Sequence, residues 1–137
     1  MELHRGRLID HIQLRCADLA ASKRFYSAVL AVLGRELTDI SPSLSYADEL
    51  CLSPANGDPG SRIHLAFQTE TRAQVDRFHE AALAAGGRDN GAPGERAYHP
   101  GYYAAFVLDP DGNNLEAVHH GEAVRSAASV VITPKLG

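Results

Sequence analysis

The chain has 137 residues, of which 45% are hydrophobic and 22% charged, and its formal net charge is −4. This length suits one domain with a substantial core. The negative charge argues against nucleic acid as a partner, because nucleic acid selects a basic face. No apolar run approaches the roughly 20 residues that span a bilayer, and the N-terminal sequence lacks the apolar centre of a signal peptide. With only two cysteines, no disulfide framework is expected, and we predict a cytoplasmic protein.

The sequence contains an internal repeat. Residues 11–34 and 64–87 align without gaps, and 8 of the 24 positions are identical, among them His11 with His64 and Gly34 with Gly87. Each copy opens on a histidine. Two copies indicate a duplicated module, since a solenoid needs three or more units. We predict a single domain made of the following parts: module 1 at about 7–54, module 2 at about 61–120, and a tail at 121–137.

Module 1 shows a strand pattern followed by a helix pattern. Residues 8–16 alternate, so that His11, Gln13 and Arg15 share one face. A helix is expected between Asp18, its N-cap, and Gly34, which ends it. Three short strands then follow, at about 35–40, 44–47 and 49–53. A linker dense in turn formers comes next, at 54–61.

Module 2 repeats this order. A strand is expected over 62–69, with His64, Ala66 and Gln68 on one face, and a helix from about Thr71 to Ala85. Residues 88–101 are rich in glycine and proline and predict a long loop. Two strands flank the turn sequence "DPDG", at 102–109 and 113–120. The tail contains one more candidate edge strand, at 128–134, whereas the N-terminus around His4 is expected to be frayed.

Strand parity brings three possible metal ligands to one face. If the apolar residues pack under the helices, His11 and His64 face the opposite, concave surface. Leu115 and Ala117 then take the helix side, so that Glu116 points the same way as the histidines. Two imidazoles and one carboxylate on rigid strands could bind Fe(II), Mn(II), Ni(II), Co(II) or Zn(II), with positions left for water or substrate.

The repeated unit, "FYSAVLAVLG" and above all "FVLDPDGNNLEAV" resemble the glyoxalase/bleomycin resistance/extradiol dioxygenase group, the vicinal oxygen chelate superfamily, over roughly residues 8–120. The resemblance implies an α+β fold in which two tandem βαβββ modules form a curved mixed sheet around a cleft. It also implies that His11, His64 and Glu116 occupy metal-ligand positions, and that the metal binds a small-molecule substrate through adjacent oxygens. Dimers are common in this family, so we expect a homodimer. Two arrangements remain open: the two modules that form one site belong either to the same chain or to two different chains.

One position departs from the family pattern. Glyoxalase I-type members supply a fourth ligand, a carboxylate, from the last strand of module 1, where this chain has Cys51. Glu49 lies two residues away and would reach that position only through a two-residue slip or a bulge. A three-ligand site suits an extradiol-type dioxygenase or another lyase or isomerase equally well. It departs from strict glyoxalase I chemistry, in which that glutamate can also act as the proton-transferring base.

Other residues are candidates for contact with the substrate. Glu116, Tyr103 and His99 are candidates for proton transfer. The candidates for substrate binding are Arg15, Cys51, Gln68 and Tyr102. Each also has a structural interpretation, because the tyrosines can pack against the other module, Cys51 can be a small buried apolar residue, and Arg15 and Gln68 can be solvated strand residues.

The alternative function is a metal-free protein that binds and sequesters a small molecule such as a drug, as bleomycin resistance proteins do. Such proteins surround a planar ligand with aromatic walls. This chain has no tryptophan and 7% aromatic residues, so it supplies few side chains for stacking. The residues therefore favour the metal-dependent enzyme over the binding protein.

Overall fold

The computed structural model describes residues 3–5, 8–58, 60, 62–124, 127, 129–133 and 135, with side chains from residue 8 onward. Two βαβββ units follow one another along the chain, which confirms the predicted α+β architecture of two modules. Module 1 consists of β2 (Ile12–Cys16), α1 (Leu19–Val32), β3 (Thr38–Ser41), β4 (Leu44–Ala47) and β5 (Leu50–Pro54). Module 2 consists of β6 (His64–Gln68), α2 (Arg72–Ala84), β7 (Arg88–Glu95), β8 (Tyr103–Leu108) and β9 (Asn114–His119).

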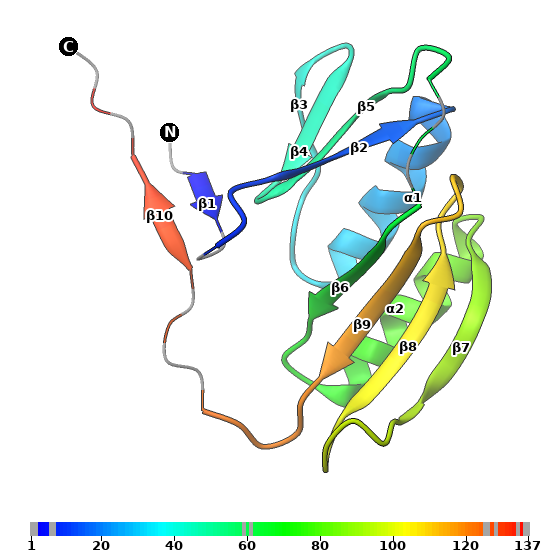
Figure 1. The fold of residues 1–137 in the computed structure, drawn as a ribbon, viewed down its shortest axis with the longest axis vertical. Coiled ribbons are helices and arrows are strands. Elements are labelled where there is room, and N and C mark those ends of the chain that lie inside the picture. The colour runs from blue at the N-terminus through cyan, green and yellow to red at the C-terminus, as the bar shows by residue number, and fades with distance from the viewer. Residues whose placement is uncertain are drawn as a thin grey trace.

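Each module forms its own four-stranded mixed sheet. The strand orders are β2–β5–β4–β3 and β6–β9–β8–β7. In both sheets the first and last strands of the module pair in parallel, and the other pairs are antiparallel. The helices α1 and α2 pack against each other and cover one face of the sheets (Figure 1). On the opposite face of the strands lie Gln13, Arg15, His64 and Gln68, as the parity of these strands had predicted.

The helices begin and end where the sequence predicted. The Asp18 carboxylate accepts a hydrogen bond from the Ala21 amide at 3.1 Å and caps α1. The Thr71 hydroxyl accepts from the Gln74 amide at 3.1 Å and caps α2 in the same way. Gly34, with a φ of +72°, follows α1, and glycine adopts this left-handed conformation without the strain of a side chain.

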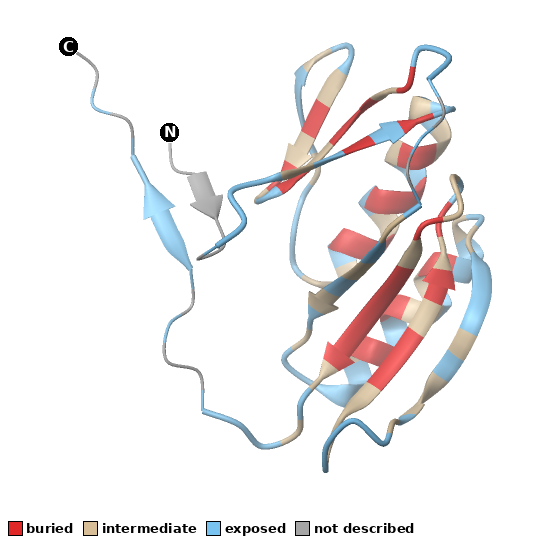
Figure 2. Ribbon diagram, in the orientation of Figure 1, coloured by how far each residue is buried: buried red, intermediate tan, exposed pale blue. Residues whose placement is uncertain are grey.

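The core lies between the helices and the sheets, where buried residues line the inner faces of both (Figure 2). In β2, Leu14 and Cys16 are buried, whereas Gln13 and Arg15 are exposed. In β6, His64 and Gln68 are likewise exposed. The strand parity inferred from the sequence is therefore confirmed. Among the described residues, none of the helices has the length and apolar character needed to cross a bilayer.

The sequence predicted a long loop at 88–101. This prediction was wrong for residues 88–95, which form β7. This strand pairs with β8, and its register shifts at Gly91 and again before Gly94. Glycine and proline are tolerated here because β7 is an edge strand with bulges. The N-terminus also differs from expectation, since β1 (Leu3–Arg5) pairs with β10 (Val130–Ile132), the predicted edge strand of the tail.

The turn between β8 and β9 ties module 2 to module 1. The Asp109 carboxylate is buried and accepts hydrogen bonds from the Tyr26 hydroxyl at 2.5 Å and from the Asn113 amide at 2.8 Å. Asp111 accepts from the Ala17 amide at 3.0 Å and from the Ser22 hydroxyl at 3.3 Å. The "DPDGN" sequence therefore joins the turn of one module to the helix of the other.

Candidate functional site

The concave face of module 2 holds a histidine, a glutamate and a tyrosine. The register of β6 and β9 pairs Ala66 with Glu116, which puts Glu116 diagonally across from His64. The His64 Nε2 atom lies 2.9 Å from Glu116 Oε1. The second carboxylate oxygen, Oε2, accepts a hydrogen bond from the Tyr102 hydroxyl. Glu116 is only 3% exposed, whereas the His64 side chain is 53% exposed. An exposed imidazole thus contacts a buried carboxylate.

The surroundings of this cluster are aromatic. The His64 ring lies 6.0 Å from the ring of Phe106, which is the partner of Glu116 in the register of β8 and β9. The Arg96 guanidinium lies over the Phe106 ring, 5.4 Å from its centre. Partial burial, and then the bond to Glu116, raises the pKa of Tyr102 to about 12. The Tyr102 hydroxyl therefore remains protonated at neutral pH and acts as a donor to Glu116.

Module 1 differs at the equivalent positions. The register of β2 and β5 pairs Gln13 with Cys51, as that of β6 and β9 pairs Ala66 with Glu116. Cys51 thus occupies in module 1 the place that Glu116 occupies in module 2. The carboxylate next to His11 is that of Asp10, with Oδ1 2.7 Å from His11 Nδ1. These two side chains are 53% and 61% exposed, so the pair lies on the surface.

Within one chain, His11 does not join His64 and Glu116. No three histidine, cysteine, aspartate or glutamate side chains in the described ranges lie where they could hold one metal ion. The strands β2 and β6 run in opposite directions in Figure 1. Ile12, at the start of β2, lines a groove between the modules together with Gln68, at the end of β6. His11 precedes Ile12, which shares the groove with the end of β6, whereas His64 is the first residue of β6.

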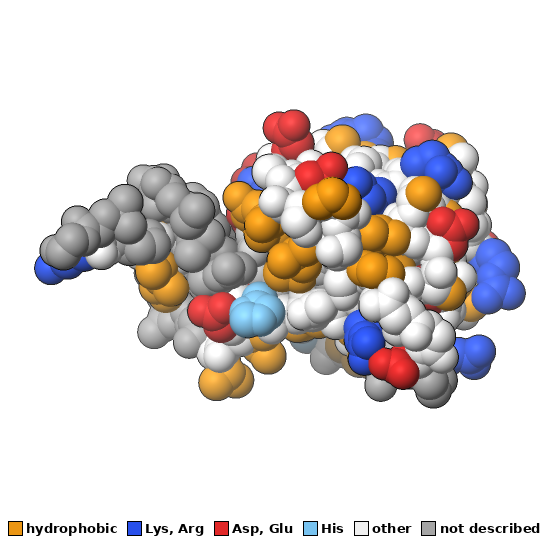
Figure 3. All heavy atoms as spheres, turned by 90° about the horizontal axis from the view of Figure 1, so that it is seen from above, with side chains coloured by type: hydrophobic (Ala, Val, Ile, Leu, Met, Phe, Trp, Pro, Cys, Tyr) orange, Lys and Arg blue, Asp and Glu red, His pale blue; other side chains and the backbone are white. Residues whose placement is uncertain are grey.

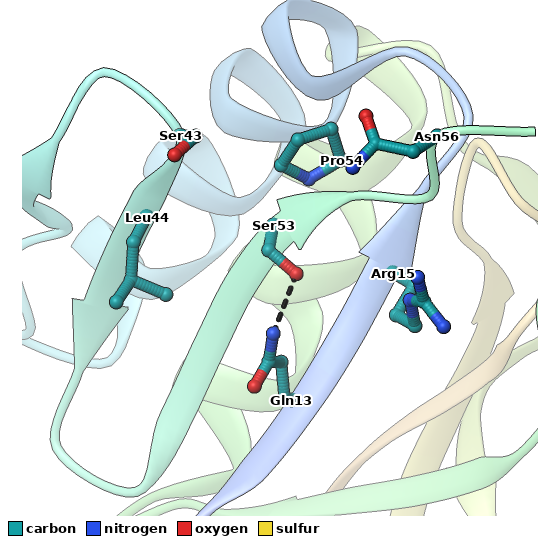
Figure 4. A pocket seen from close by; sticks show the side chains of 7 residues that line it. All are labelled: Gln13, Arg15, Ser43, Leu44, Ser53, Pro54 and Asn56. Atoms are coloured by element: carbon teal, nitrogen blue, oxygen red, sulfur yellow. Dashed lines mark hydrogen bonds between the residues drawn. The ribbon is translucent and has the colours of Figure 1, made fainter.

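The concave face of module 1 contains a hollow of about 600 Å³ (Figure 4). Gln13 and Ser53 point toward each other across β2 and β5, and Gln13 Nε2 donates to Ser53 Oγ at 2.7 Å. Arg15 is the cation of the hollow, with Nη2 2.8 Å from the carboxylate of Asp58. The remaining lining residues are Ser43, Leu44, Pro54 and Asn56. Apolar and hydrogen-bonding groups are therefore combined around one positive charge.

The other predicted residues lie elsewhere. The Tyr103 hydroxyl donates to Asp76 of α2 at 2.7 Å, and Arg72 of α2 lies over the Tyr103 ring at 4.6 Å. Tyr103 thus faces the helix, away from Glu116. His99 Nε2 lies 2.9 Å from His120 Nδ1, in a cluster beside Tyr102. Gln68 lines the groove between the modules.

Sequence reasoning did not identify the contact of Tyr102 with Glu116, the His99–His120 pair or the place of Asp10. Alternation could have separated Tyr102 from Tyr103, because adjacent residues of a strand face opposite sides. The pattern of 102–109 is ambiguous, however, since Ala104 and Phe106 on one face are as apolar as Ala105 and Val107 on the other. For Asp10 and His120, which lie outside the regular alternation, we find no signal of this kind.

Comparison with known proteins identifies the family. Residues 8–117 match the model of the glyoxalase/bleomycin resistance protein/dioxygenase superfamily. The chain belongs to this superfamily. The resemblance inferred from "FVLDPDGNNLEAV" and the repeated units is thereby confirmed.

Individual relatives agree with this assignment. The chain is 34% identical over 128 aligned positions to the uncharacterized protein YqjT of Bacillus subtilis (strain 168), covering 80% of this chain and 97% of that protein. A glyoxalase/bleomycin resistance protein from Albidiferax ferrireducens T118 is 32% identical, with a TM-score of 0.68 over 80% of this chain and 96% of that one. A lactoylglutathione lyase from Agrobacterium tumefaciens shares the fold at 22% identity, with a TM-score of 0.60 over 82% of this chain and 93% of that one.

Proposed function

We propose that the protein is a divalent-metal-dependent enzyme, a lyase, isomerase or dioxygenase, whose metal is held by His64, Glu116 and His11. The observation that carries the proposal is the exposed His64 imidazole against the buried Glu116 carboxylate. A carboxylate withdrawn from water in an interior costs several kcal/mol unless it is paired. Such a group on a concave face, next to an accessible imidazole, is a functional-site candidate. The location that we propose is the cytoplasm, which the low cysteine content favours.

The donor set suits Fe(II), Mn(II), Ni(II), Co(II) or Zn(II). Imidazole nitrogen and carboxylate oxygen are ligands of these ions, and two histidines with one carboxylate leave positions open. His64 Nε2 and Glu116 Oε1 are 2.9 Å apart, which is about the separation of two neighbouring ligands that each lie about 2.0–2.1 Å from one ion. These two atoms could therefore bind the same metal with little movement.

The third ligand, His11, would come from a second copy of the chain. His11 lies apart from His64 within one chain, so module 1 of one copy must meet module 2 of another to complete the ligand set. An apolar surface adjoins His11, since the Leu8 side chain is 93% exposed and that of Ile9 is 49% exposed. Two copies related by a twofold axis would bury such a surface and form two equal sites.

The hollow of module 1 would then receive the substrate. Arg15 supplies a planar, charged donor that binds a carboxylate or another oxyanion. Cys51 and Ser53 line the same face of β5, and Leu44 and Pro54 provide apolar contact. We propose a small molecule with an anionic group at Arg15 and two adjacent oxygens at the metal end. Mixed acidic and basic side chains on the face shown in Figure 3 suit a small ligand better than a large polyanion.

Residues near the metal would also transfer the proton that leaves the substrate carbon. When bound, the metal would act as a Lewis acid that stabilises negative charge on a substrate oxygen. Glu116 Oε1 lies beside His64 and, by leaving the metal, would become free to accept a proton from the carbon next to that substrate oxygen. His99 remains a candidate for returning the proton, for which its Nε2 would have to break its bond to His120. We assign no such role to Tyr103, because its hydroxyl is bound to Asp76 on the helix side.

The alternative is a metal-free protein that binds a small molecule in the hollow of module 1. It is favoured by one observation, the cysteine at the position where module 1 could have offered a carboxylate. Ligand binding would then be independent of His64 and Glu116. A ligand that binds with the same affinity in EDTA, and equally to Glu116→Gln protein, would support this alternative over the enzyme.

The first test is the metal content of protein loaded separately with Fe(II), Mn(II), Ni(II) and Zn(II), measured by mass spectrometry. We expect about one metal per chain, as in other sites with three protein ligands, and its loss in Glu116→Gln. Glu49→Gln is the matched control, because Glu49 is exposed and lies beside the groove. Retention of metal in Glu116→Gln, or no metal in any preparation, would contradict the proposal.

A further inference from the structure

The two oxygens of Glu116 have different partners. Oε1 lies 2.9 Å from His64 Nε2, and Oε2 accepts the hydrogen bond of the Tyr102 hydroxyl. The carboxylate is 3% exposed, so solvent does not compete for either oxygen. With Oε2 held by a phenol, the carboxylate cannot rotate without breaking that bond. Glu116 therefore presents Oε1, and not Oε2, to the His64 imidazole.

Tyr102 is itself held on three sides. Its ring makes edge contacts with the rings of Tyr98, His99 and His120, at centroid distances of 4.9, 5.2 and 5.3 Å. On the backbone, the Arg96 amide donates to the Tyr102 carbonyl at 2.9 Å, and the Tyr102 amide donates to the His99 carbonyl at 3.2 Å. The tyrosine thus sits in a box of aromatic rings that limits its rotation.

The two histidines of this box are bonded to each other. His99 Nδ1 lies 2.9 Å from the carbonyl oxygen of Pro100, and His99 Nε2 lies 2.9 Å from His120 Nδ1. A carbonyl oxygen only accepts, so Nδ1 of His99 carries the proton, and Nε2 of neutral His99 accepts from His120. The His99–His120 pair therefore joins the segment before β8 to the end of β9, and the Tyr102 ring meets both imidazoles edge-on.

Two glycines allow this close approach. Gly101 and Gly121 have φ angles of +85° and +80° and lie backbone to backbone. A Cβ on Gly101 would come within 3.3 Å of both the Gly121 Cα and the His120 carbonyl oxygen. A Cβ at either position would be crowded and its backbone strained at these φ angles, so glycine allows the two segments to approach this closely.

We propose that Tyr102 is a positioning residue that fixes Glu116 as a ligand through a single oxygen, and that the His99–His120 pair braces Tyr102 in that role. The inference deepens the proposed function and rests on it for its consequence at the metal. Partners of metal ligands typically change metal affinity by about 10- to 100-fold when removed. The loss of the hydroxyl would also free Oε2, so that the carboxylate could bind the metal through both oxygens.

Tyr102→Phe is the test, and Tyr103→Phe is its matched control. Both variants lose one phenolic hydroxyl from neighbouring residues, but the Tyr103 hydroxyl is bound to Asp76 on the opposite face. With Co(II) as the probe, we expect Tyr102→Phe to weaken binding about 10- to 100-fold and to change the visible absorption spectrum of the bound ion. Tyr103→Phe should change neither. His120→Asn, which removes the brace but keeps the hydroxyl, should lower affinity by a smaller factor.

A second measurement tests the inference in protein without metal. In the ¹H–¹⁵N spectrum of the imidazoles, near pH 8, we expect the His64 signal to shift in Tyr102→Phe and to stay unchanged in Tyr103→Phe. Metal-binding wild-type protein whose affinity and Co(II) spectrum are unaltered by Tyr102→Phe would overturn the inference. If the wild type binds no metal, the proposed function fails instead, and an unshifted His64 signal would then overturn the positioning role as well.

Discussion

The two modules share a sequence pattern and a strand order but hold their histidines differently. His64 of module 2 rests on Glu116, a buried carboxylate on the neighbouring strand that Tyr102 also binds. His11 of module 1 lies beside Asp10, an exposed neighbour in the chain, and Cys51 occupies the place of Glu116. Exposed ion pairs contribute only about 0–1 kcal/mol and are readily exchanged. Both halves therefore share the scaffold, but only module 2 has a buried carboxylate beside its histidine.

This difference suggests a division of labour. Module 2 offers a nitrogen and oxygen pair held by a buried carboxylate, whereas module 1 offers an exposed histidine and a hollow with Arg15. Preorganised groups bind without first losing conformational freedom, so they gain more from each contact. We expect module 2 to dominate metal affinity and module 1 to dominate the choice of substrate.

The largest difference between the two modules is expected in metal affinity, when the proposed metal ligands are replaced. His64→Ala removes one half of the rigid pair, and we expect metal affinity to fall by about 100-fold or more, since even partners of ligands contribute about 10- to 100-fold. His11→Ala should have a smaller effect, because the rigid pair stays intact. Chelator competition with Zn(II) would measure both. A larger loss in His11→Ala than in His64→Ala would contradict the division proposed here.

The junction between the modules should be the next most sensitive place. Asp109 is buried and accepts hydrogen bonds from Tyr26 and from the turn, so Asp109→Ala would leave several donors without an acceptor. We expect a loss of about 4 kcal/mol in the free energy of unfolding. Asp111→Ala, at a half-exposed position, should lose about 1 kcal/mol. Urea denaturation would show whether this order holds, and equal losses would argue against Asp109 as the centre of the junction.

The repeat-equivalent glycines should respond differently to alanine. A Cβ on Gly87 would lie 2.7 Å from the Phe25 ring and 2.8 Å from the Ala82 carbonyl oxygen, whereas one on Gly34 would meet nothing within 4 Å. Gly34 is needed instead for its φ of +72°. We expect Gly87→Ala to cost about 2–3 kcal/mol through overpacking and Gly34→Ala about 1 kcal/mol through backbone strain. The melting temperatures of the two variants would test this order. A larger decrease in Gly34→Ala than in Gly87→Ala would contradict the explanation.

The smallest expected effect is on alkaline stability. Burial, and then the negative charge of Asp109, raises the pKa of Tyr26 far above that of a free tyrosine. The folded state therefore keeps this proton when the unfolded state releases it. The stabilisation is complete below about pH 10, the pKa of an unfolded tyrosine, and is lost progressively as the pH rises above it. Unfolding between pH 8 and pH 11 should show a steeper decline in the wild type than in Tyr26→Phe, and parallel curves would refute the assignment.

Local patterns predicted much of this structure. Alternation brought His64 and Glu116 to the same face of the sheet because strand parity depends only on neighbouring residues. The helix ends followed from Asp18, Thr71 and Gly34 for the same reason. The equivalence of Cys51 to Glu116 was also accessible, because "ELCLS" of module 1 aligns with "NLEAV" of module 2.

Other features were not accessible from local patterns. The distance between His11 and the His64–Glu116 pair depends on how two modules pack, which no single strand encodes. Residues 88–95 form an edge strand despite their glycines and proline, because bulges at an edge tolerate both. Tyr102 could not be separated from Tyr103, since both faces of β8 carry apolar residues.

The most direct test of the central claim is to mix two defective chains. If each site joins His11 of one copy to His64 and Glu116 of another, a dimer of a His11→Ala chain with a Glu116→Gln chain contains one intact site. After the two proteins are unfolded together and refolded, we predict that the mixture contains Zn(II) sites of wild-type affinity, which neither protein has alone. Metal binding in the mixture no greater than the sum of the separate proteins would contradict a cleft shared between copies.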